Sequence, residues 1–252
     1  MLKIENTEVM GWEAAIKGMR NPMNSWEKSD SGYCETHEPA HCSDCEYIKC
    51  CHADEADIAT KYIVGPNDLD LMIRLHNAGT DRRKFMRMIT VYLDITAPLY
   101  WWKEFDTYKV GTVANSCSTM HKIAAKAFTL EDFSHEHLGV TIPAEKNDGE
   151  ECYQNLWLES LKAIITNLNI ARSYYSTEKD SELKKAYWWQ MIQLLPSSYN
   201  QRRTVMLNYE VLANIYKSRR NHKLDEWHTF CDWIEELPFS ELITGKEKNN
   251  AN

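Results

Sequence analysis

The sequence lacks an excess of positive charge. Its 29 lysine and arginine residues are outnumbered by 37 aspartate and glutamate residues, so the formal net charge is −8 at pH 7. A field of that sign does not favour binding to DNA or to an anionic membrane. A small phosphorylated ligand stays compatible with this composition, because a few local cations are enough to hold it.

Long hydrophobic runs are also missing. No stretch reaches the length of a transmembrane helix, and the first residues, MLKIENTEVMGW, do not have the pattern of a signal peptide. We therefore expect a cytoplasmic protein that does not act on a membrane. In that compartment the eight cysteines are expected to be thiols or metal ligands rather than disulfides.

Internal repeats and clear linkers are lacking too. With 252 residues, of which 43% are hydrophobic and 26% charged, the chain is long enough for one large domain with a core. Apolar periodicity and turn residues predict strands at 2–9, 86–95 and 204–208, and helices at 12–19, 68–77, 116–128, 153–175, 183–194, 209–218 and 224–236. Asp68 is expected to cap its helix, and Pro98 to open one that carries Trp101 and Trp102. The mixture predicts a single α+β domain over residues 1–245, with a cysteine-rich insert at about 30–56 and a flexible tail at 246–252.

The insert has the spacing of a metal site. It contains Cys34-x2-His37, Cys42-x2-Cys45 and Cys50-Cys51-His52. Ligands three positions apart suit tetrahedral zinc, because a short turn points both side chains at one ion. The segment has few apolar residues, so a metal could supply its order. We predict structural zinc bound by Cys34, Cys42, Cys45 and Cys50, with reduced free thiols as the alternative.

Two further stretches, residues 95–121 and 195–227, have the layout of a nucleotide site. In the first, Ala97-Pro98 follows a predicted strand and precedes an aromatic helix and a polar segment. In the second, Leu195-Pro196 is followed at fixed offsets by Asn208, Leu212, Asn214 and Arg219, and then by Glu226-Trp227. This order resembles that of the flavin-dependent thymidylate synthases, which have Leu-Pro, Asn, Leu, Asn and Arg at the same offsets.

The signature of that family, R-H-R-x-x-S-x-N-E-x-S-x-R-Y, is only partly kept. Laid without gaps, its named positions fall on Thr107, Tyr108, Lys109, Thr112, Ala114, Asn115, Cys117, Thr119 and Met120. Lys109 and Thr112 are the conservative changes. Shifting the second half by one residue would instead place Asn115 on the Asn and Ser118 on the second Ser, and both registers stay open.

The resemblance implies a fold and a reaction. The fold is an α+β domain with a central, mainly antiparallel sheet flanked by helices. The reaction is reductive methylation of dUMP, or a related one-carbon modification of a pyrimidine deoxynucleotide, with FAD as cofactor and NADPH and methylenetetrahydrofolate as co-substrates. The resemblance also implies a homotetramer with shared sites. No enzyme nucleophile is implied, so the protein would supply positioning and electrostatics, and no catalytic residue is singled out.

The resemblance further implies which residues bind the nucleotide and the flavin: Lys109, Thr112, Asn115, Cys117, Asn208 and Arg219. Arg219 keeps the guanidinium fork that grips a phosphate or a uracil oxyanion, whereas Lys109 keeps only the charge. Losing two arginine forks would weaken binding by roughly two to four orders of magnitude. We therefore expect other cations, Arg83 and Arg203 among them, to face the same cleft.

Simpler roles compete with these assignments. Arg219 could complement a helix dipole, Asn208 could cap a helix, and Trp101 and Trp102 could belong to the core. Cys117 could be a buried, inert thiol. Two other functions also stay open: a nucleotide-binding or partner-binding protein that has lost catalysis on the same fold, and a zinc-stabilised helical protein with a different fold.

Overall fold

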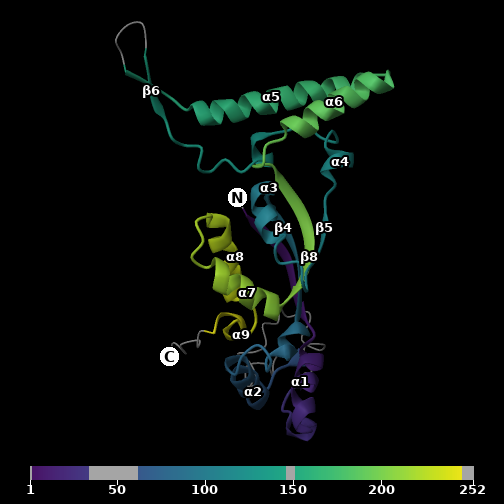
Figure 1. Ribbon diagram of the computed structural model, residues 1–252, viewed down its shortest axis with the longest axis vertical. Coiled ribbons are helices and arrows are strands. Elements are labelled where there is room, and N and C mark those ends of the chain that lie inside the picture. The colour runs from purple at the N-terminus through teal and green to yellow at the C-terminus, as the bar shows by residue number, and fades with distance from the viewer. Residues whose placement is uncertain (1, 34–61, 146–150, 246–252) are drawn as a thin grey trace, which may run out of the picture. The chain divides into compact units, whose positions relative to one another are not determined.

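The computed structural model of the chain describes residues 2–33, 62–145 and 151–245 (Figure 1). The chain divides into two compact units. The first unit consists of Met1–Glu5, Asp94–Thr107 and Ala114–Thr204, and the second of Asn6–Leu93, Tyr108–Val113 and Val205–Asn252. Each unit therefore brings together segments that lie far apart in the sequence.

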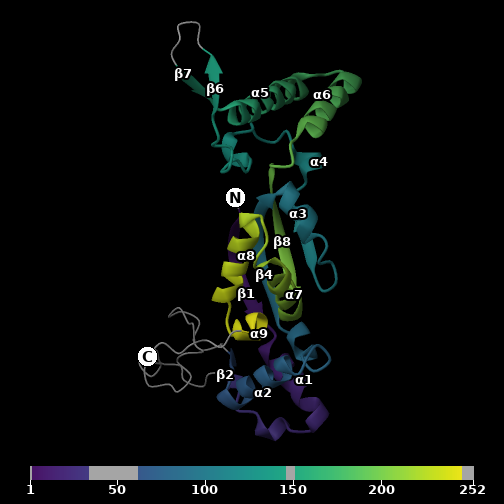
Figure 2. The same cartoon turned by 60° about the vertical axis from the view of Figure 1, so that its left-hand side comes forward.

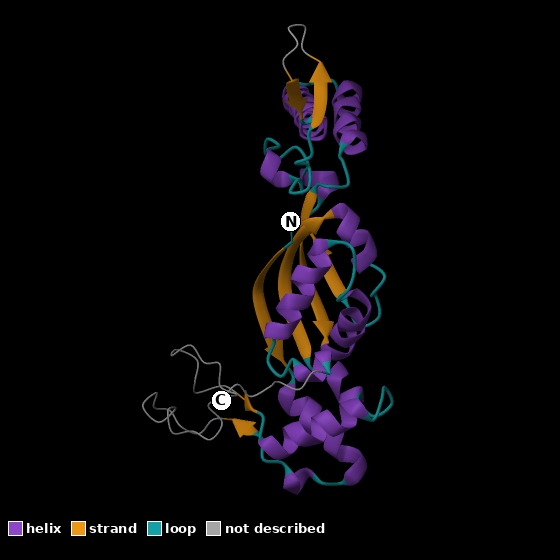
Figure 3. Cartoon of the chain, turned by 90° about the vertical axis from the view of Figure 1, so that its left-hand side faces the viewer, coloured by secondary structure: helices purple, strands orange, loops and turns teal. Residues whose placement is uncertain are grey.

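Four strands form the central sheet, in the order β1 (Lys3–Met10), β4 (Thr90–Pro98), β8 (Asn200–Asn208) and β5 (Val113–Ser116). Backbone hydrogen bonds join Leu99 to Tyr199 beyond one end of β4 and Ile89 to Tyr209 beyond the other, so β4 and β8 run antiparallel. Figure 3 shows the strands side by side, and each of them is divided between the two units. The predicted α+β fold with a central antiparallel sheet is confirmed.

The second unit contains the helices near both ends of the chain. They are α1 (Trp12–Arg20), α2 (Pro66–Asn77), α7 (Tyr209–Arg219), α8 (Asp225–Glu236) and α9 (Glu241–Thr244). Tyr209, Leu212 and Ile215 of α7 are fully buried, as are Trp227 and Phe230 of α8. α7 therefore lies within the core of this unit. The predicted helices at 209–218 and 224–236 are confirmed by α7 and α8.

The first unit is built around a long helical hairpin. It contains α3 (Leu99–Phe105), α4 (Thr119–Lys122), β6 (Ile142–Glu145), β7 (Glu151–Gln154), α5 (Leu156–Thr177) and α6 (Ser181–Leu194). α5 and α6 lie side by side in Figures 1 and 2. Their buried residues form a core with the loop that follows α4: Ile123, Phe128, Phe133, Leu161, Leu168, Ala171 and Met191. None of the helices in the described part of the chain has the length and apolarity needed to cross a bilayer.

Several predicted elements differ in extent from the observed ones. The strand predicted at 86–95 begins only at Thr90, because residues Lys84–Arg87 form a 3₁₀ turn. The prediction of a helix over 116–128 was wrong for most of that stretch, because only Thr119–Lys122 is helical. The amide group of Asn169 on α5 bonds both the backbone nitrogen and the oxygen of Phe128, at 2.9 Å each. A side chain thus satisfies backbone groups that a helix would otherwise pair.

The predicted cap of α2 was also wrong. α2 begins at Pro66, so Asp68 lies inside its first turn. The cap comes from Asp30, whose carboxylate accepts from the backbone nitrogens of Asn67 and Asp68 at 2.8 and 3.0 Å. Asp68 is fully buried and accepts instead from Nε of Arg20 at 2.6 Å. A buried guanidinium needs a carboxylate partner, and that need decides the role of Asp68.

Candidate functional site

The segment 108–113 packs along α7, and this brings the two predicted motif regions together within the second unit. Gly111 has a φ of +80°, and a β-carbon at this position would lie 2.9 Å from the amide nitrogen of Asn208, at the start of α7. Tyr108 accepts a hydrogen bond at 2.9 Å from Nε of Arg219, at the other end of α7. The segment therefore contacts both ends of the helix that carries the predicted amide and guanidinium groups.

Arg219 is held by two aromatic rings. Its guanidinium carbon lies 4.9 Å from the ring centroid of Trp227 and 5.7 Å from that of Tyr108, both within the range of a cation–π contact. The two rings themselves meet edge to face at 6.1 Å. Trp227 is fully buried, while Arg219 is partly exposed. The guanidinium is thus fixed against a rigid wall and still reaches the surface of the unit.

Asn208 is a helix cap. Its side-chain oxygen accepts from the backbone nitrogen of Val211 at 3.0 Å, which satisfies a first-turn donor of α7. The residue is 9% exposed. This is the simpler of the two roles considered from the sequence, and it leaves the side-chain oxygen committed to the backbone rather than to a ligand.

Lys109 and Thr112 flank Gly111 in the turn that contacts the start of α7. The hydroxyl of Thr112 is buried and has no hydrogen-bond partner among the described residues, which costs free energy on the order of 1–3 kcal/mol. Lys109 is exposed, and its carbonyl accepts from the backbone nitrogen of Thr112 at 3.3 Å. A buried hydroxyl without a partner is the kind of group that a ligand atom or a water molecule satisfies.

Arg83 belongs to the same unit, but its charge is balanced inside the fold. Its Nε lies 3.0 Å from the carboxylate of Glu210 on α7, and the two side chains are 18% and 8% exposed. The pair is in contact, although neither atom has a well-aligned hydrogen bond within the described residues. Burial and the charge of Arg83 lower the pKa of the neighbouring His76, while Glu210 acts in the opposite direction.

Arg203 belongs to the first unit and has three partners there. Its guanidinium lies 4.1 Å from the ring of Trp102, and it donates to Asp106 at 2.8 Å and to the side chain of Gln201 at 3.0 Å. Gln201 in turn donates to the carbonyl of Cys117 at 3.1 Å. Arg203 therefore ties β8 to α3 and to the end of β5.

Asn115 and Cys117 are also in the first unit, on and just after β5, and both are exposed. The expectation that Cys117 is buried and inert is therefore wrong as to burial. Trp101 and Trp102, at 0% and 1% exposure, are core residues as the simpler interpretation held. The structure thus gathers four of the six predicted binding residues, Lys109, Thr112, Asn208 and Arg219, in one unit.

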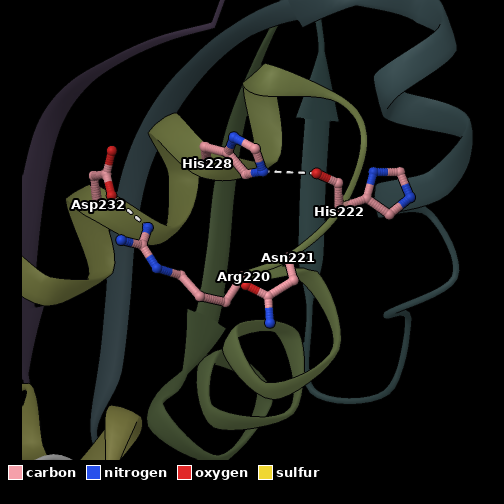
Figure 4. Close-up of a pocket in the computed structure, with 5 residues that line it drawn as sticks. All are labelled: Arg220, Asn221, His222, His228 and Asp232. Carbon is pink, nitrogen blue, oxygen red and sulfur yellow. Dashed lines mark hydrogen bonds and ion pairs between the residues drawn. The ribbon is translucent and has the colours of Figure 1, made fainter.

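A pocket that the sequence analysis did not predict follows Arg219 directly. It has a volume of about 500 Å³ and is lined by Arg220, Asn221, His222, His228 and Asp232 (Figure 4). His228 contacts the carbonyl of His222 at 2.6 Å, and Arg220 pairs with Asp232. Its volume is in the range of small-molecule sites. The only sequence signal for it is the run Arg219-Arg220-Asn221-His222 at the end of a helix.

Comparison with solved structures identifies the fold. No protein-family model matches the sequence, and no curated protein matches it either. Two structures of the flavin-dependent thymidylate synthase ThyX from Helicobacter pylori, with FAD and dUMP, superpose with TM-scores of 0.58 and 0.56 at 13% and 12% identity. They cover 96% and 97% of this chain and 97% of each of those chains. The chain has the fold of the flavin-dependent thymidylate synthases.

A third structure with this fold is a UMP/dUMP methylase, PolB from Streptomyces cacaoi, bound with 5-Br dUMP. It superposes with a TM-score of 0.53 at 12% identity and covers 97% of this chain and 95% of its own. At such low identity the likeness concerns the backbone fold. The thymidylate synthase fold predicted from residues 95–121 and 195–227 is thereby confirmed at the level of structure.

The predicted zinc site is not part of what the structure describes. Cys34, Cys42, Cys45 and Cys50 lie outside the described residues. Among the residues that the structure describes, no group of three or more His, Cys, Asp or Glu side chains could hold a metal ion. Zinc binding by the insert stays a prediction.

Proposed function

We propose that the chain is a flavin-dependent thymidylate synthase-like enzyme that methylates dUMP, or a related pyrimidine deoxynucleotide, with FAD as cofactor. One observation carries the proposal: the segment 108–113 meets α7, and Arg219 is held against Tyr108 and Trp227 at that junction. The fold supports it, because two solved structures of that fold are complexes with FAD and dUMP.

The residues at this junction fit an anionic, hydrogen-bonding ligand. A guanidinium matches the two oxygens of a phosphate or the oxygen of a uracil anion. The buried hydroxyl of Thr112 has no partner in the described chain. Lys109 places a second cation on the same turn. A bound nucleotide would supply the acceptors that these groups require.

In this proposal, the protein acts by binding and orientation. FAD would supply the hydride chemistry when bound, together with NADPH and methylenetetrahydrofolate as co-substrates. Arg219 would hold the anionic edge of the nucleotide, and Lys109 would add positive potential. Thr112 would accept or donate one hydrogen bond. Such fixed donors stabilise charge that develops during reaction, because they need no reorganisation.

A second function is favoured by specific substitutions. Thr107 and Tyr108 stand where the signature has Arg and His, and the oxygen of Asn208 serves as a helix cap. A site with these losses could retain nucleotide binding without turnover. The alternative is therefore a catalytically inactive protein that binds a nucleotide or a partner protein on the same fold.

We also propose a homo-oligomer, a tetramer by the resemblance. The hairpin of α5 and α6 exposes large apolar side chains: Leu156 (42%), Trp157 (51%), Ile170 (50%), Tyr174 (55%), Leu183 (52%) and Trp189 (42%). A contiguous apolar patch formed by such side chains would be covered by another protein surface. A further copy of the chain is the occupant that the resemblance implies.

Purified protein distinguishes the two functions. An absorbance spectrum with flavin bands, dUMP binding by calorimetry and rescue of a thymidine-requiring bacterial strain would together support the enzyme. A colourless protein that binds dUMP and does not rescue growth would support the inactive binding protein. A folded protein with neither flavin nor nucleotide affinity would overturn both. Arg219→Lys is the matched variant, and we expect it to lower dUMP affinity by roughly 10-fold or more.

A further inference from the structure

We propose that Tyr108 and Trp227 are positioning residues that hold the guanidinium of Arg219 in one orientation for the anionic group of the nucleotide. The inference rests on the proposed function, because it assigns a role within the same site. The inference adds two side chains to the proposed function. These side chains act through Arg219 and do not need to touch the nucleotide.

The geometry fixes Arg219 in two ways. Its Nε donates to the hydroxyl of Tyr108 at 2.9 Å, which anchors one edge of the guanidinium plane. Its guanidinium carbon lies over the buried indole of Trp227, 4.9 Å from the ring centroid. A hydrogen bond at Nε and a ring contact at the guanidinium carbon together restrict the rotation of the planar group.

Three separate segments supply these groups. Tyr108 lies on the segment after α3, Arg219 is the last residue of α7, and Trp227 lies in the first half of α8. The edge-to-face contact between the two rings, at 6.1 Å, makes them a single support rather than two independent ones. The position of Arg219 is therefore set by the tertiary packing of the unit and not by the flexible end of a helix.

Such support matters because an arginine side chain has many rotamers. Ordering it during binding would reduce affinity, whereas a guanidinium that is already ordered does not lose that entropy again. A bidentate grip also depends on the angle of the plane, so a tilted fork would lose one of its two bonds. Tyr108→Phe removes the edge anchor and leaves the ring, which makes it the most specific variant.

The test is a coupling experiment with dUMP as the probe. We expect Tyr108→Phe to weaken dUMP binding about 5- to 20-fold in calorimetry, since it removes one hydrogen bond that orients the guanidinium. In an Arg219→Lys background, which has no fork to position, the same change should weaken binding less than about 2-fold. Tyr216→Phe removes another tyrosine hydroxyl from α7, one that donates to Glu235, and should leave dUMP affinity unchanged.

A second measurement covers the case in which Arg219→Lys binds too weakly for calorimetry. The Nε proton of Arg219, assigned in nitrogen-15 spectra by its absence from Arg219→Lys, should exchange with water at least 10-fold faster in Tyr108→Phe than in the wild type. Equal losses of affinity in both backgrounds, or an unchanged exchange rate, would overturn the positioning role. Wild-type protein that does not bind dUMP at all would instead overturn the proposed function, and the inference with it.

Discussion

Gly111 and Asn208 are in such close contact that a larger residue at position 111 would have to displace the Asn208 side chain. A β-carbon there would lie 2.9 Å from the amide nitrogen of Asn208 and 3.1 Å from a methyl carbon of Val211. The backbone of Gly111 is also left-handed, with a φ of +80°. The turn that carries Lys109 and Thr112 is therefore built directly on the capped first turn of α7, and the cap and the candidate site are one structural feature.

We expect Gly111→Ala to destabilise the protein by about 1–3 kcal/mol, because it combines a left-handed backbone with a steric clash. Urea denaturation would measure the change. Gly79→Ala is the matched control: Gly79 has a φ of +102°, yet nothing lies within 4 Å of a β-carbon there. Gly79→Ala should lose only the stability that comes from the strained backbone, about 1 kcal/mol. Equal losses at both positions would mean that contact with Asn208 is unimportant.

The local parts of the fold were predictable from the sequence. α7 and α8 have apolar residues at helical spacing, and the sequence placed both of them nearly at their observed bounds. The offsets that connect Leu195-Pro196 with Asn208 and Arg219 carried the fold assignment, because they span a strand and a helix whose lengths the fold fixes. Periodicity and spacing can be read from a single sequence without knowledge of the tertiary fold.

The long-range parts were not predictable. Asp68 is a residue type that often caps helices. In the fold, however, its carboxylate accepts a hydrogen bond from Arg20, which lies forty-eight positions earlier. The stretch 116–128 has helical composition, but Asn169 on α5 satisfies its backbone at Phe128. Which group pairs with which depends on the tertiary fold. The support of Arg219 by Tyr108 and Trp227 is of the same kind, since neither spacing nor composition connects these residues.

The buried pair of Arg20 and Asp68 gives a prediction for stability. Burial alone would raise the pKa of Asp68, but hydrogen bonds from Ser29, Ser31 and Arg20, and the charge of Arg20, outweigh it and lower the pKa below its ordinary value. We expect Asp68→Asn to cost about 3–5 kcal/mol at pH 7, because it leaves a buried guanidinium without a counter-charge. Urea denaturation at pH 7 would measure this loss.

The sign of the pH dependence follows from the lowered pKa. Asp68 contributes stability that is present above its unfolded pKa of about 4 and is lost as the pH falls through the folded value. The difference between wild type and Asp68→Asn should therefore shrink below pH 4. Asp70→Asn is the control on the same helix, since Asp70 pairs with Arg74 in a largely exposed bridge. It should change stability by less than about 1 kcal/mol.

His76 predicts a pH dependence in a higher range. Burial and the charge of Arg83 lower its pKa, against the opposing influence of Glu210. The folded state therefore binds a proton at His76 less readily than the unfolded state, so stability is fully present above the unfolded pKa of about 6.5 and decreases as the pH falls below it. The slope should stay below about 1.4 kcal/mol per pH unit, which is the limit for a difference of one whole proton. Urea titrations at pH 8, 6.5 and 5.5 would show it, and His76→Gln should reduce it.

The matched control for His76 is His121→Gln, which replaces an exposed imidazole on α4. We expect this variant to keep the slope of the wild type. A slope that survives in His76→Gln and disappears in another histidine variant would contradict the assignment to the half-buried imidazole beside Arg83.

The exposed apolar side chains of α5 and α6 predict how the protein assembles. Trp157→Glu places a charge in that surface and should shift the protein to a smaller species, because a buried unpaired carboxylate opposes association. Size-exclusion chromatography with light scattering measures the mass. Trp26→Glu is the control, since Trp26 is 48% exposed against 51% for Trp157 but lies on another element. The same shift in both variants, or a monomeric wild type, would argue against an α5–α6 interface.

The cysteine-rich insert gives a prediction for metal content. The strands flanking it, β2 (Gly32–Tyr33) and β3 (Tyr62–Ile63), pair antiparallel, so Tyr33 and Tyr62, on either side of the insert, are held together. A metal that joins Cys34, Cys42, Cys45 and Cys50 would then close shorter loops, at a smaller entropy cost. We expect one zinc per chain by elemental analysis.

Cys42→Ser combined with Cys45→Ser should abolish the zinc, because these two residues form the closest ligand pair of the insert. Cys117→Ser is the control, since this exposed thiol lies outside the insert and should leave the zinc content unchanged. A chelator should release the metal from the wild type and lower its melting temperature, and it should have no such effect on the double variant. Wild-type protein purified without metal, folded and indifferent to added zinc, would show that the cysteines are free thiols.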